Sequence, residues 1–278
     1  MGMAMNLNEV AKMGSFARIS VLALVFAPAE YCAPVWCRSS HAQLVDSELN
    51  NAVRVITGCL LNTPVSSVYV MSNIAPPPIR REALALKSAW KALSDESSLL
   101  HEMVAKVYRQ LQVPTRTSAR LNLAPTRVVE QRLTSRRPFQ RAAQLLLSSV
   151  GGNCPVTADQ RRSRADHFVL DKWRTDWRGD DAWKEYYQVP DTVPLRDLPS
   201  RLAWSRLNRL VTCRTRLAAD MYKCGLANSP ACDCGAPYQT SQHVVEECPL
   251  RRLHGGFRKL ASLDNDALSW LKNLDLEI

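Results

Sequence analysis

Residues 232–249 read Cys232-Asp-Cys-Gly-Ala-Pro-Tyr-Gln-Thr-Ser-Gln-His-Val-Val-Glu-Glu-Cys-Pro249. Four side chains that can bind a metal fall within 17 residues, in the spacing C-x-C-x8-H-x4-C: Cys232, Cys234, His243 and Cys248. Three thiolates and one imidazole are a common ligand set for structural zinc, which they surround as a tetrahedron. The stretch therefore predicts a small zinc-binding segment, and we expect it to decide the local fold.

The residues between the ligands predict how the backbone presents them. Gly235 allows a tight turn directly after the cysteine pair, because glycine tolerates conformations that are strained for other residues. His243 and Cys248 are five residues apart, so a helix that carries both has to end or distort near Glu247. Pro249 is consistent with such an end, because a proline disfavours helical backbone at the residue before it.

Other interpretations of these cysteines remain open at the level of sequence. They could be unligated thiols in an exposed loop, or they could form a disulfide. The C-x-C pair is also tighter than the C-x2-C pair of common zinc patterns. Cys224, eight residues before Cys232, could therefore replace one member of the pair.

An ordered set of short motifs surrounds the same stretch. It consists of Leu207-Asn-Arg-Leu210, Met221-Tyr-Lys-Cys-Gly-Leu226, Ser229-Pro230, Cys232-Asp-Cys-Gly235, Gln239-Thr240, His243-Val244 and Glu247-Cys-Pro249. The set resembles the C-terminal cysteine-histidine segment of non-LTR (LINE-type) retrotransposon reverse transcriptases of the jockey-like kind. The resemblance covers roughly Trp204 to Leu271. This chain departs from the pattern at Cys213, where relatives usually have glycine, and at Cys224, where they usually have tryptophan.

A second group of motifs lies near the N-terminus: Ala29-Glu-Tyr-Cys-Ala-Pro-Val-Trp36, Leu44-Val-Asp46 and Leu49-Asn-Asn51. These resemble the region after the catalytic palm of the same enzymes, where the thumb begins. The resemblance implies a C-terminal fragment of an RNA-directed DNA polymerase, without palm or endonuclease, that retains zinc-binding and nucleic-acid-binding parts. A domesticated, non-catalytic zinc and nucleic-acid-binding protein, or a decayed element product without function, are the alternatives.

Composition restricts the partners and the compartment. The chain has 278 residues, a formal net charge of +10 and a pI near 9.3, which favours a polyanion such as RNA or DNA as partner. Nine cysteines, an odd number, do not suggest a secreted disulfide framework, so we expect a reduced, intracellular protein. The apolar run from Ile19 to Ala29 is too short to cross a bilayer, and we expect it to form a buried helix. No small-molecule substrate is evident.

Apolar periodicity and capping residues predict a mainly α-helical fold. Ser39 or Ser40 can cap a first helix from about residue 41, and Gly58 can close it. Pro78 precedes a second helix, and a third runs from about Asp95 to Gln112. The expected buried stripes of these three helices are Leu44, Val45, Leu49, Ala52, Val53 and Ile56, then Ile79, Ala83, Leu86, Trp90 and Leu93, then Leu99, Met103, Val107 and Leu111.

Further helices are expected at 142–150, from Asp159 to about Tyr187, across a helical lead-in from Arg201 to Cys224, and after Asp264 or Asp266. Trp173 and Trp177 lie four residues apart, which predicts one packed helix face rather than base stacking. We therefore expect a thumb-like helical region, a basic connector, a helical Trp-rich region, and a basic helix with a zinc-knuckle-like segment. Their predicted bounds are 1–113 (1–20 unassigned), 114–141, 142–200 and 201–278.

Two groups of arginines are candidates for phosphate contacts, because guanidinium forks suit phosphate oxygens. The connector contains seven against one acid: Arg116, Arg120, Arg127, Arg132, Arg136, Arg137 and Arg141. The basic helix contributes Arg206, Arg209, Arg214 and Arg216. A solvated linker is the alternative interpretation of the connector.

No catalytic residue is predicted. Reverse transcription requires carboxylates that hold two metal ions, and the one Asp-Asp pair, Asp180-Asp181, lacks a hairpin pattern and a third carboxylate. We interpret it as a helix start and expect no catalytic Mg²⁺ site and no polymerase activity. Cys154 and His167 lie in unrelated contexts, so their pairing as a nucleophile and base is not supported.

Overall fold

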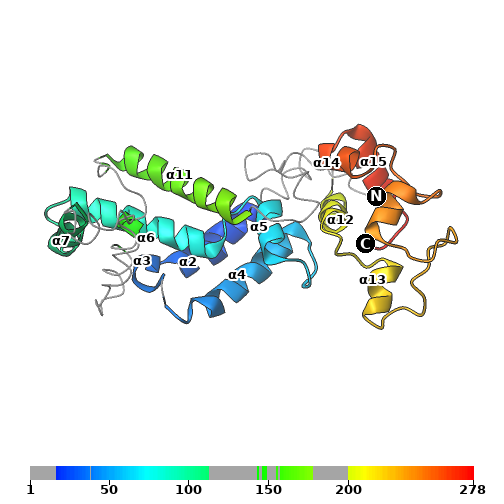
Figure 1. Ribbon diagram of the computed structural model, residues 1–278, viewed down its shortest axis with the longest axis horizontal. Helices are drawn as coiled ribbons and strands as arrows, with labels where there is room; N and C mark the ends of the chain where they lie inside the picture. Colours follow the sequence, from blue (N-terminus) through cyan, green and yellow to red (C-terminus); the bar gives the residue numbers. More distant parts are fainter. Residues whose placement is uncertain are drawn as a thin grey trace, which may run out of the picture. The chain divides into compact units, whose positions relative to one another are not determined.

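The computed structural model describes residues 17–37, 39–112, 143, 146–148, 155, 157–177 and 200–278, and its described residues are mainly helical, with no β-strand among them (Figure 1). This confirms the predicted mainly α fold. The chain divides into two compact units. We call residues 1–26, 48–74 and 177–278 the metal unit, and residues 27–47 and 75–176 the helical unit.

The metal unit contains the second part of α4 (Ala42–Thr57), α5 (Val65–Ser72) and the elements after residue 200. These are α12 (Arg201–Val211), α13 (Ala218–Lys223), the π-helical turn η3 (His243–Glu247), α14 (Gly256–Ser262) and α15 (Asn265–Asn273). The π-helical segment η1 (Leu22–Phe26) also belongs to it. Leu207, Leu210, Leu260 and Leu271 are almost fully buried and lie on α12, α14 and α15, which pack together.

Side chains of α12 stabilise the C-terminal end of α4. The last carbonyl groups of a helix have no partner within it. Here Trp204 Nε1 donates to the Ile56 carbonyl at 3.2 Å, Asn208 Nδ2 to the Thr57 carbonyl at 2.8 Å, and Arg209 Nε to the Gly58 carbonyl at 2.7 Å. Gly58 ends α4 as predicted, with a left-handed φ of 67°. A Cβ at this position would lie 2.0 Å from the Ser205 Oγ atom, so glycine is required for the close approach of α12.

The lead-in expected from Arg201 to Cys224 is two helices, because the backbone turns at residues 212–217. Ser200 caps α12 by accepting a hydrogen bond from the Ala203 N–H, and Cys213 adopts a left-handed φ of 51° after its end. Thr215 then donates from Oγ1 to Asp220 Oδ2 at 2.6 Å, a contact that fixes the start of α13.

The helical unit is formed by α2 (Ala27–Glu30), α3 (Ala33–Trp36), the start of α4, α6 (Pro77–Ser94), α7 (His101–Gln112) and α11 (Ala158–Trp177). Its core contains Leu86, Trp90, Val104, Leu146 and Ala165, among other buried residues. Figure 1 shows α6 and α11 side by side. They are joined by ion pairs of Lys172 with Glu82 and of Lys87 with Asp166.

A buried ion pair attaches α4 to α6 within this unit. Arg81, only 3% exposed, forms a bidentate pair with Asp46, and its guanidinium lies 5.1 Å from the centre of the Trp36 ring. Arg80 pairs in the same way with Glu30 of α2. Short helices α2 and α3, which have little propensity to form alone, are thereby held against α6.

Several predicted positions agree with the structure. Leu49, Val53 and Ile56 of α4 are buried, as are Ile79, Ala83, Leu86 and Trp90 of α6. Trp173 and Trp177 are buried too, so the prediction of a packed face is confirmed. The predicted helix end at Tyr187 lies outside the described residues.

Other predictions were wrong. Ile19 is 60% exposed and Leu24 is 75% exposed, and within the run from Ile19 to Ala29 Phe26 alone is buried. The third helix begins at His101 rather than Asp95, because Asp95 accepts hydrogen bonds from Ser97 and forms a turn instead. Leu99 therefore lies in this turn and is fully exposed, and Leu44 is exposed on the outer face of α4.

Candidate metal centre

A tight turn positions the two cysteines of the C-x-C pair. The Gly235 N–H donates to the Cys232 carbonyl at 2.9 Å, and the Cys232 N–H donates to the Ala236 carbonyl at 2.9 Å. Gly235 has a left-handed φ of 92°, which glycine adopts at little cost. A single intervening residue, Asp233, therefore suffices to turn both sulfur atoms to one side.

The π-helical turn η3 positions the other two ligands. The Cys248 N–H donates to the His243 carbonyl at 2.7 Å, an i→i+5 hydrogen bond. This wider turn brings residues five apart closer to one face than an α-helix would. Cys248 then leaves the helix in an extended conformation before Pro249, which confirms the predicted helix end near Glu247.

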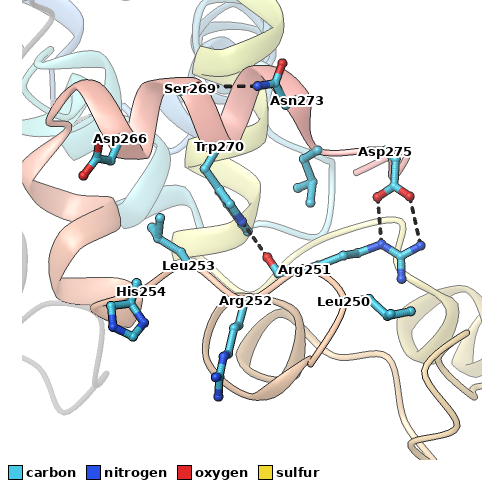
Figure 2. Close-up of a pocket in the computed structure, with 11 residues that line it drawn as sticks. Leu250, Arg251, Arg252, Leu253, His254, Asp266, Ser269, Trp270, Asn273 and Asp275 are labelled. Carbon is cyan, nitrogen blue, oxygen red and sulfur yellow. Dashed lines mark hydrogen bonds and ion pairs between the residues drawn. The ribbon is translucent and has the colours of Figure 1, made fainter.

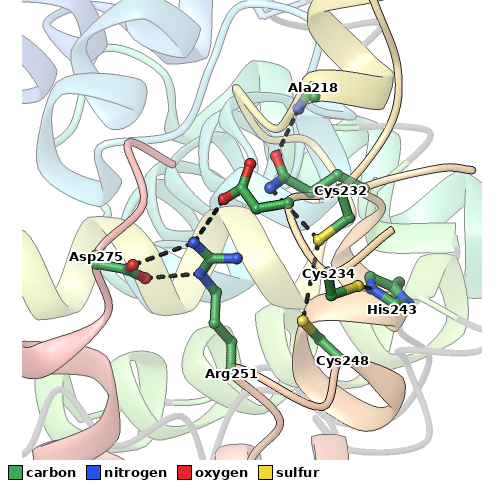
Figure 3. Close-up of polar contacts among 9 residues, drawn as sticks. Ala218, Cys232, Cys234, His243, Cys248, Arg251 and Asp275 are labelled. Atoms are coloured by element: carbon green, nitrogen blue, oxygen red, sulfur yellow. Dashed lines mark hydrogen bonds and ion pairs between the residues drawn. The ribbon is translucent and has the colours of Figure 1, made fainter. Parts of the chain in front are cut away.

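The four predicted ligands converge. One ligand atom from each of Cys232, Cys234, His243 and Cys248 lies within 4.8 Å of all the others. The sulfur atoms of Cys232 and Cys248 are 3.9 Å apart, and Cys234 Sγ lies 3.2 Å from His243 Nε2 (Figure 3). A tetrahedron with Zn–S bonds of about 2.3 Å has S–S edges of about 3.8 Å. The arrangement is therefore of the size that a tetrahedral metal requires.

The same geometry bears on the alternatives left open by the sequence. A disulfide needs sulfur atoms about 2.05 Å apart, far closer than the 3.9 Å between Cys232 and Cys248. Cys232 is 4% exposed and Cys248 fully buried, unlike stray thiols in an exposed loop. Cys224 is exposed and is not part of the cluster. The cluster that could hold a metal ion therefore contains both Cys232 and Cys234.

Hydrogen bonds favour the thiolate at one of the cysteines. Burial raises the pKa of the Cys232 thiol, but hydrogen bonds from the Cys234 backbone and side chain, from His243 and from Gln239 outweigh it and lower that pKa to about 7. The pKa of the Cys234 thiol is raised: the hydrogen bond from the Ala236 backbone is the largest single influence and lowers it, but desolvation and the neighbouring thiols of Cys232 and Cys248 together outweigh that bond. One cysteine is therefore readily deprotonated, as metal binding requires.

Neighbouring polar groups orient the ligands. Glu247 Oε2 lies 3.5 Å from His243 Nδ1, which leaves Nε2 as the ring nitrogen that faces the cysteines. The buried Gln239 accepts a hydrogen bond from the Ala218 N–H at 3.0 Å, and its Nε2 lies 3.8 Å from Cys232 Sγ. Metal-ligating side chains are commonly held by such second partners. The sequence pattern predicted neither Gln239 nor Glu247 for this role.

The segment after Cys248 packs against α15 beside a hollow of about 710 Å³ (Figure 2). The Arg251 and Arg252 N–H groups donate to the Cys248 carbonyl, and Trp270 Nε1 donates to the Arg251 carbonyl. The Arg251 side chain forms ion pairs with Asp233, between the two cysteines of the pair, and with Asp275, beyond the end of α15. Arg251 was also not identified from the sequence, because no ligand spacing marks it.

The predicted nucleic-acid-binding arginines of the C-terminal part have different surroundings. Arg206 donates to the carbonyl of Leu271, in the last turn of α15, and to that of Leu276, beyond its end. Arg209 donates to the carbonyls of Gly58 and Ile278. Arg214 is exposed, and Arg216 forms an exposed ion pair with Glu277.

The connector arginines, Arg116 to Arg141, lie outside the described residues, as do Asp180 and Asp181. No helix in the described ranges has the length and apolar character to cross a membrane. Comparisons of this chain with protein-family models, with curated proteins and with solved structures find no match.

Proposed function

We propose that this chain is the post-palm part of a non-LTR retrotransposon reverse transcriptase, in which a zinc ion shapes the C-terminal segment for binding RNA or DNA. The observation that carries the proposal is the convergence of Cys232, Cys234, His243 and Cys248 within 4.8 Å. These residues are the centre of the ordered motif set that resembles the C-terminal segment of those enzymes.

Zinc is the metal that best suits this ligand set. Three sulfur ligands and one imidazole in a tetrahedral arrangement favour Zn²⁺ over Mg²⁺, Ca²⁺ or Mn²⁺, which prefer oxygen ligands. Four protein ligands also occupy every position of a tetrahedron, whereas catalytic zinc keeps one position for water or substrate. We therefore assign the ion a structural role: to fold the segment from Pro230 to Pro249.

Positive charge supports a nucleic-acid partner. The chain has a net charge of +10, and the connector from 114 to 141 contributes +6 of it, seven arginines less Glu130. Of the helix-side candidates, Arg214 and Arg216 are exposed. Arg206 and Arg209 direct their guanidinium groups to backbone carbonyls. We therefore expect most phosphate contacts to come from the connector.

The test is a salt titration with a fluorescent single-stranded RNA, read by anisotropy. Log affinity should fall linearly with log salt, by about 0.7 per phosphate contact. Changing Arg132, Arg136 and Arg137 together to alanine should reduce the slope by about 2. The matched control removes three exposed cations elsewhere, Lys91, Arg162 and Lys272, and should change the slope by less than about 1.

Two results would contradict the proposal. A slope unchanged by the triple arginine substitution would make residues 114–141 a linker only. Zinc below about 0.2 ions per chain in the purified protein, against the single ion of a four-ligand site, would remove the structural role of the metal.

A further inference from the structure

Arg251 connects three separate parts of the metal unit. Its Nη2 lies 2.7 Å from Asp233 Oδ2 in the C-x-C turn, and its Nε lies 2.7 Å from Asp275 Oδ1 beyond α15. Its backbone N–H donates to the carbonyl of the ligand Cys248 at 3.2 Å. The side chain is only 10% exposed, although both carboxylates are more than half exposed. The guanidinium is thus covered and the acids are at its outer edge.

One nitrogen of this guanidinium has no partner. Nη1 is buried and makes no hydrogen bond. In the view of Figure 3, the guanidinium nitrogen without a dashed contact, Nη1, points away from Asp275 and toward the side on which Cys232 and Cys248 are drawn. A buried cationic N–H without an acceptor costs free energy, so such a group calls for an acceptor that the bare protein does not supply.

Metal binding would create an acceptor on that side. Three thiolates and a neutral imidazole around a divalent ion carry a net charge of −1, and sulfur retains much of it. Charged groups that are buried are stabilised by hydrogen-bonded partners of opposite sign. Thr240, Gln239 and Glu247 contact the cluster without bringing a positive charge. Arg251 is a cation that contacts both the C-x-C turn, through Asp233, and the backbone carbonyl of Cys248.

We propose that Arg251 is a positioning residue of the metal centre: its buried Nη1 donates to the thiolates of Cys232 and Cys248 once a metal is bound. The inference rests on the proposed function, since it requires metal at the four ligands. We also propose that metal binding is coupled to the docking of α15. The Arg251 guanidinium binds Asp275, and the Arg251 backbone carbonyl accepts a hydrogen bond from Trp270 of α15.

The experiment uses the full chain loaded with Zn²⁺ or Co²⁺. Arg251→Gln should weaken metal affinity about 10- to 100-fold, the usual effect of losing an outer partner, and should therefore speed metal release to a chromogenic chelator. In the Co²⁺ form its sulfur-to-metal charge-transfer band should move to longer wavelength, because a hydrogen bond lowers the energy of the sulfur electrons. Arg251→Lys keeps the positive charge but loses the planar guanidinium with its several N–H donors. Metal release from this variant should therefore be slower than from Arg251→Gln but faster than from the wild type. The adjacent exposed Arg252→Gln is the control and should leave rate and spectrum unchanged.

A second measurement does not depend on the stability of the Arg251 variants. Asp275 is exposed, so Asp275→Asn should fold normally while weakening the contact with Arg251. In the wild type, metal should slow hydrogen exchange of residues 265–278, and in Asp275→Asn this protection should largely disappear with metal still bound.

The outcomes separate the two proposals. A wild type that binds no metal contradicts the proposed function and this inference together. A wild type that binds one ion, with release rate and spectrum unchanged in Arg251→Gln, contradicts this inference alone. Exchange of residues 265–278 that is insensitive to metal in the wild type contradicts the coupling to α15.

Discussion

His243 and Cys248 can share a metal because one backbone hydrogen bond widens the turn between them. In a regular α-helix, residues five apart point well away from each other. The i→i+5 bond from the Cys248 N–H to the His243 carbonyl corrects this, and the Thr240 side chain accepts from the His243 N–H at the start of the turn. The π-turn is thus the local feature that converts the sequence spacing into a site.

Removal of a ligand should unfold this segment locally. Between Pro230 and Pro249, Val244 and Val245 are buried, but Tyr238 is 61% exposed, so apolar burial alone is small. Under the proposed function, metal binding therefore supplies much of the local folding free energy. We expect Cys248→Ser and His243→Ala to lower zinc from about one ion per chain to near zero, and to increase hydrogen exchange throughout 230–253. Metal analysis and exchange mass spectrometry measure both effects.

The same variants should leave hydrogen exchange in α6 slow, because the buried side chains of α6 belong to the core of the helical unit. Cys224→Ser is the control, since Cys224 is exposed and not part of the cluster. Zinc lost in Cys224→Ser but kept in Cys248→Ser would show that the ligand set is wrong.

Gly58 should be far less replaceable than Gly225, although both have a left-handed φ. At either position alanine pays roughly 1–2 kcal/mol for the backbone conformation. At Gly58 the new Cβ would also lie 2.0 Å from Ser205 Oγ and 3.2 Å from the Ser205 Cα, whereas nothing lies within 4 Å at Gly225. With overpacking of about 1–3 kcal/mol added, we expect Gly58→Ala to destabilise the chain by about 3 kcal/mol and Gly225→Ala by about 1 kcal/mol. Urea unfolding compares the two, and equal values would contradict the close approach of α12.

At the scale of elements, α12 stabilises the unit through its polar side chains as well as its leucines. Trp204, Asn208 and Arg209 supply donors to the last carbonyls of α4, and Arg206 supplies donors to those of α15. Cations at helix C-termini are favourable because the exposed carbonyls carry partial negative charge. The basic residues of this helix therefore close the ends of two others.

Asn208→Ala tests this role of α12. Asn208 is fully buried and donates to the Thr57 carbonyl at 2.8 Å. Alanine would leave that buried carbonyl unpaired, which costs about 1–3 kcal/mol. Leu202→Ala in the same helix is the control: Leu202 is 57% exposed, so its loss should cost less than about 0.5 kcal/mol. Similar losses in the two variants, measured by urea denaturation, would show that the cap is energetically unimportant.

At the scale of the whole molecule, the positively charged side chains divide between contacts within the chain and, under the proposed function, contacts with a nucleic acid. Arg201, Arg206 and Arg209 bind backbone carbonyls of the metal unit, and Arg80 and Arg81 pair with acids of the helical unit. Several of the 36 lysines and arginines are therefore engaged within the chain, and the net charge of +10 does not by itself measure how many cations a polyanion can reach. Under the proposed function, the connector from 114 to 141 is the main source of the remainder.

The whole chain should lack polymerase activity by itself. Reverse transcription needs a set of carboxylates that holds two metal ions. The one pair of adjacent aspartates in the sequence is Asp180-Asp181, which lacks a hairpin pattern and a third carboxylate. Primer extension on an RNA template with Mg²⁺ or Mn²⁺ should remain at background. Extension that is abolished by Asp181→Ala would contradict the prediction.

What the sequence determined by itself was local. The four ligands lie within 17 residues, so their convergence depends on one turn and one short helix, and both could be predicted from Gly235 and from the spacing before Pro249. The end of α4 at Gly58, the start of α15 at one of its two candidate residues, Asp264, and the packed face of Trp173 and Trp177 were equally predictable. In each case neighbouring residues provide the physical cause.

The tertiary structure alone decided which residues distant in the chain contact one another through hydrogen bonds and ion pairs. Asn208 and the carbonyl of Thr57 are 151 residues apart, and Arg206 and Leu271 are 65 apart. The face of α12 that looks solvent-exposed from its charges is therefore partly engaged with other helices. Arg251 is the clearest case: the ion pair that links a cysteine turn to Asp275 leaves no periodic or spacing signal, because charge pairing depends on proximity in space and not on separation along the chain.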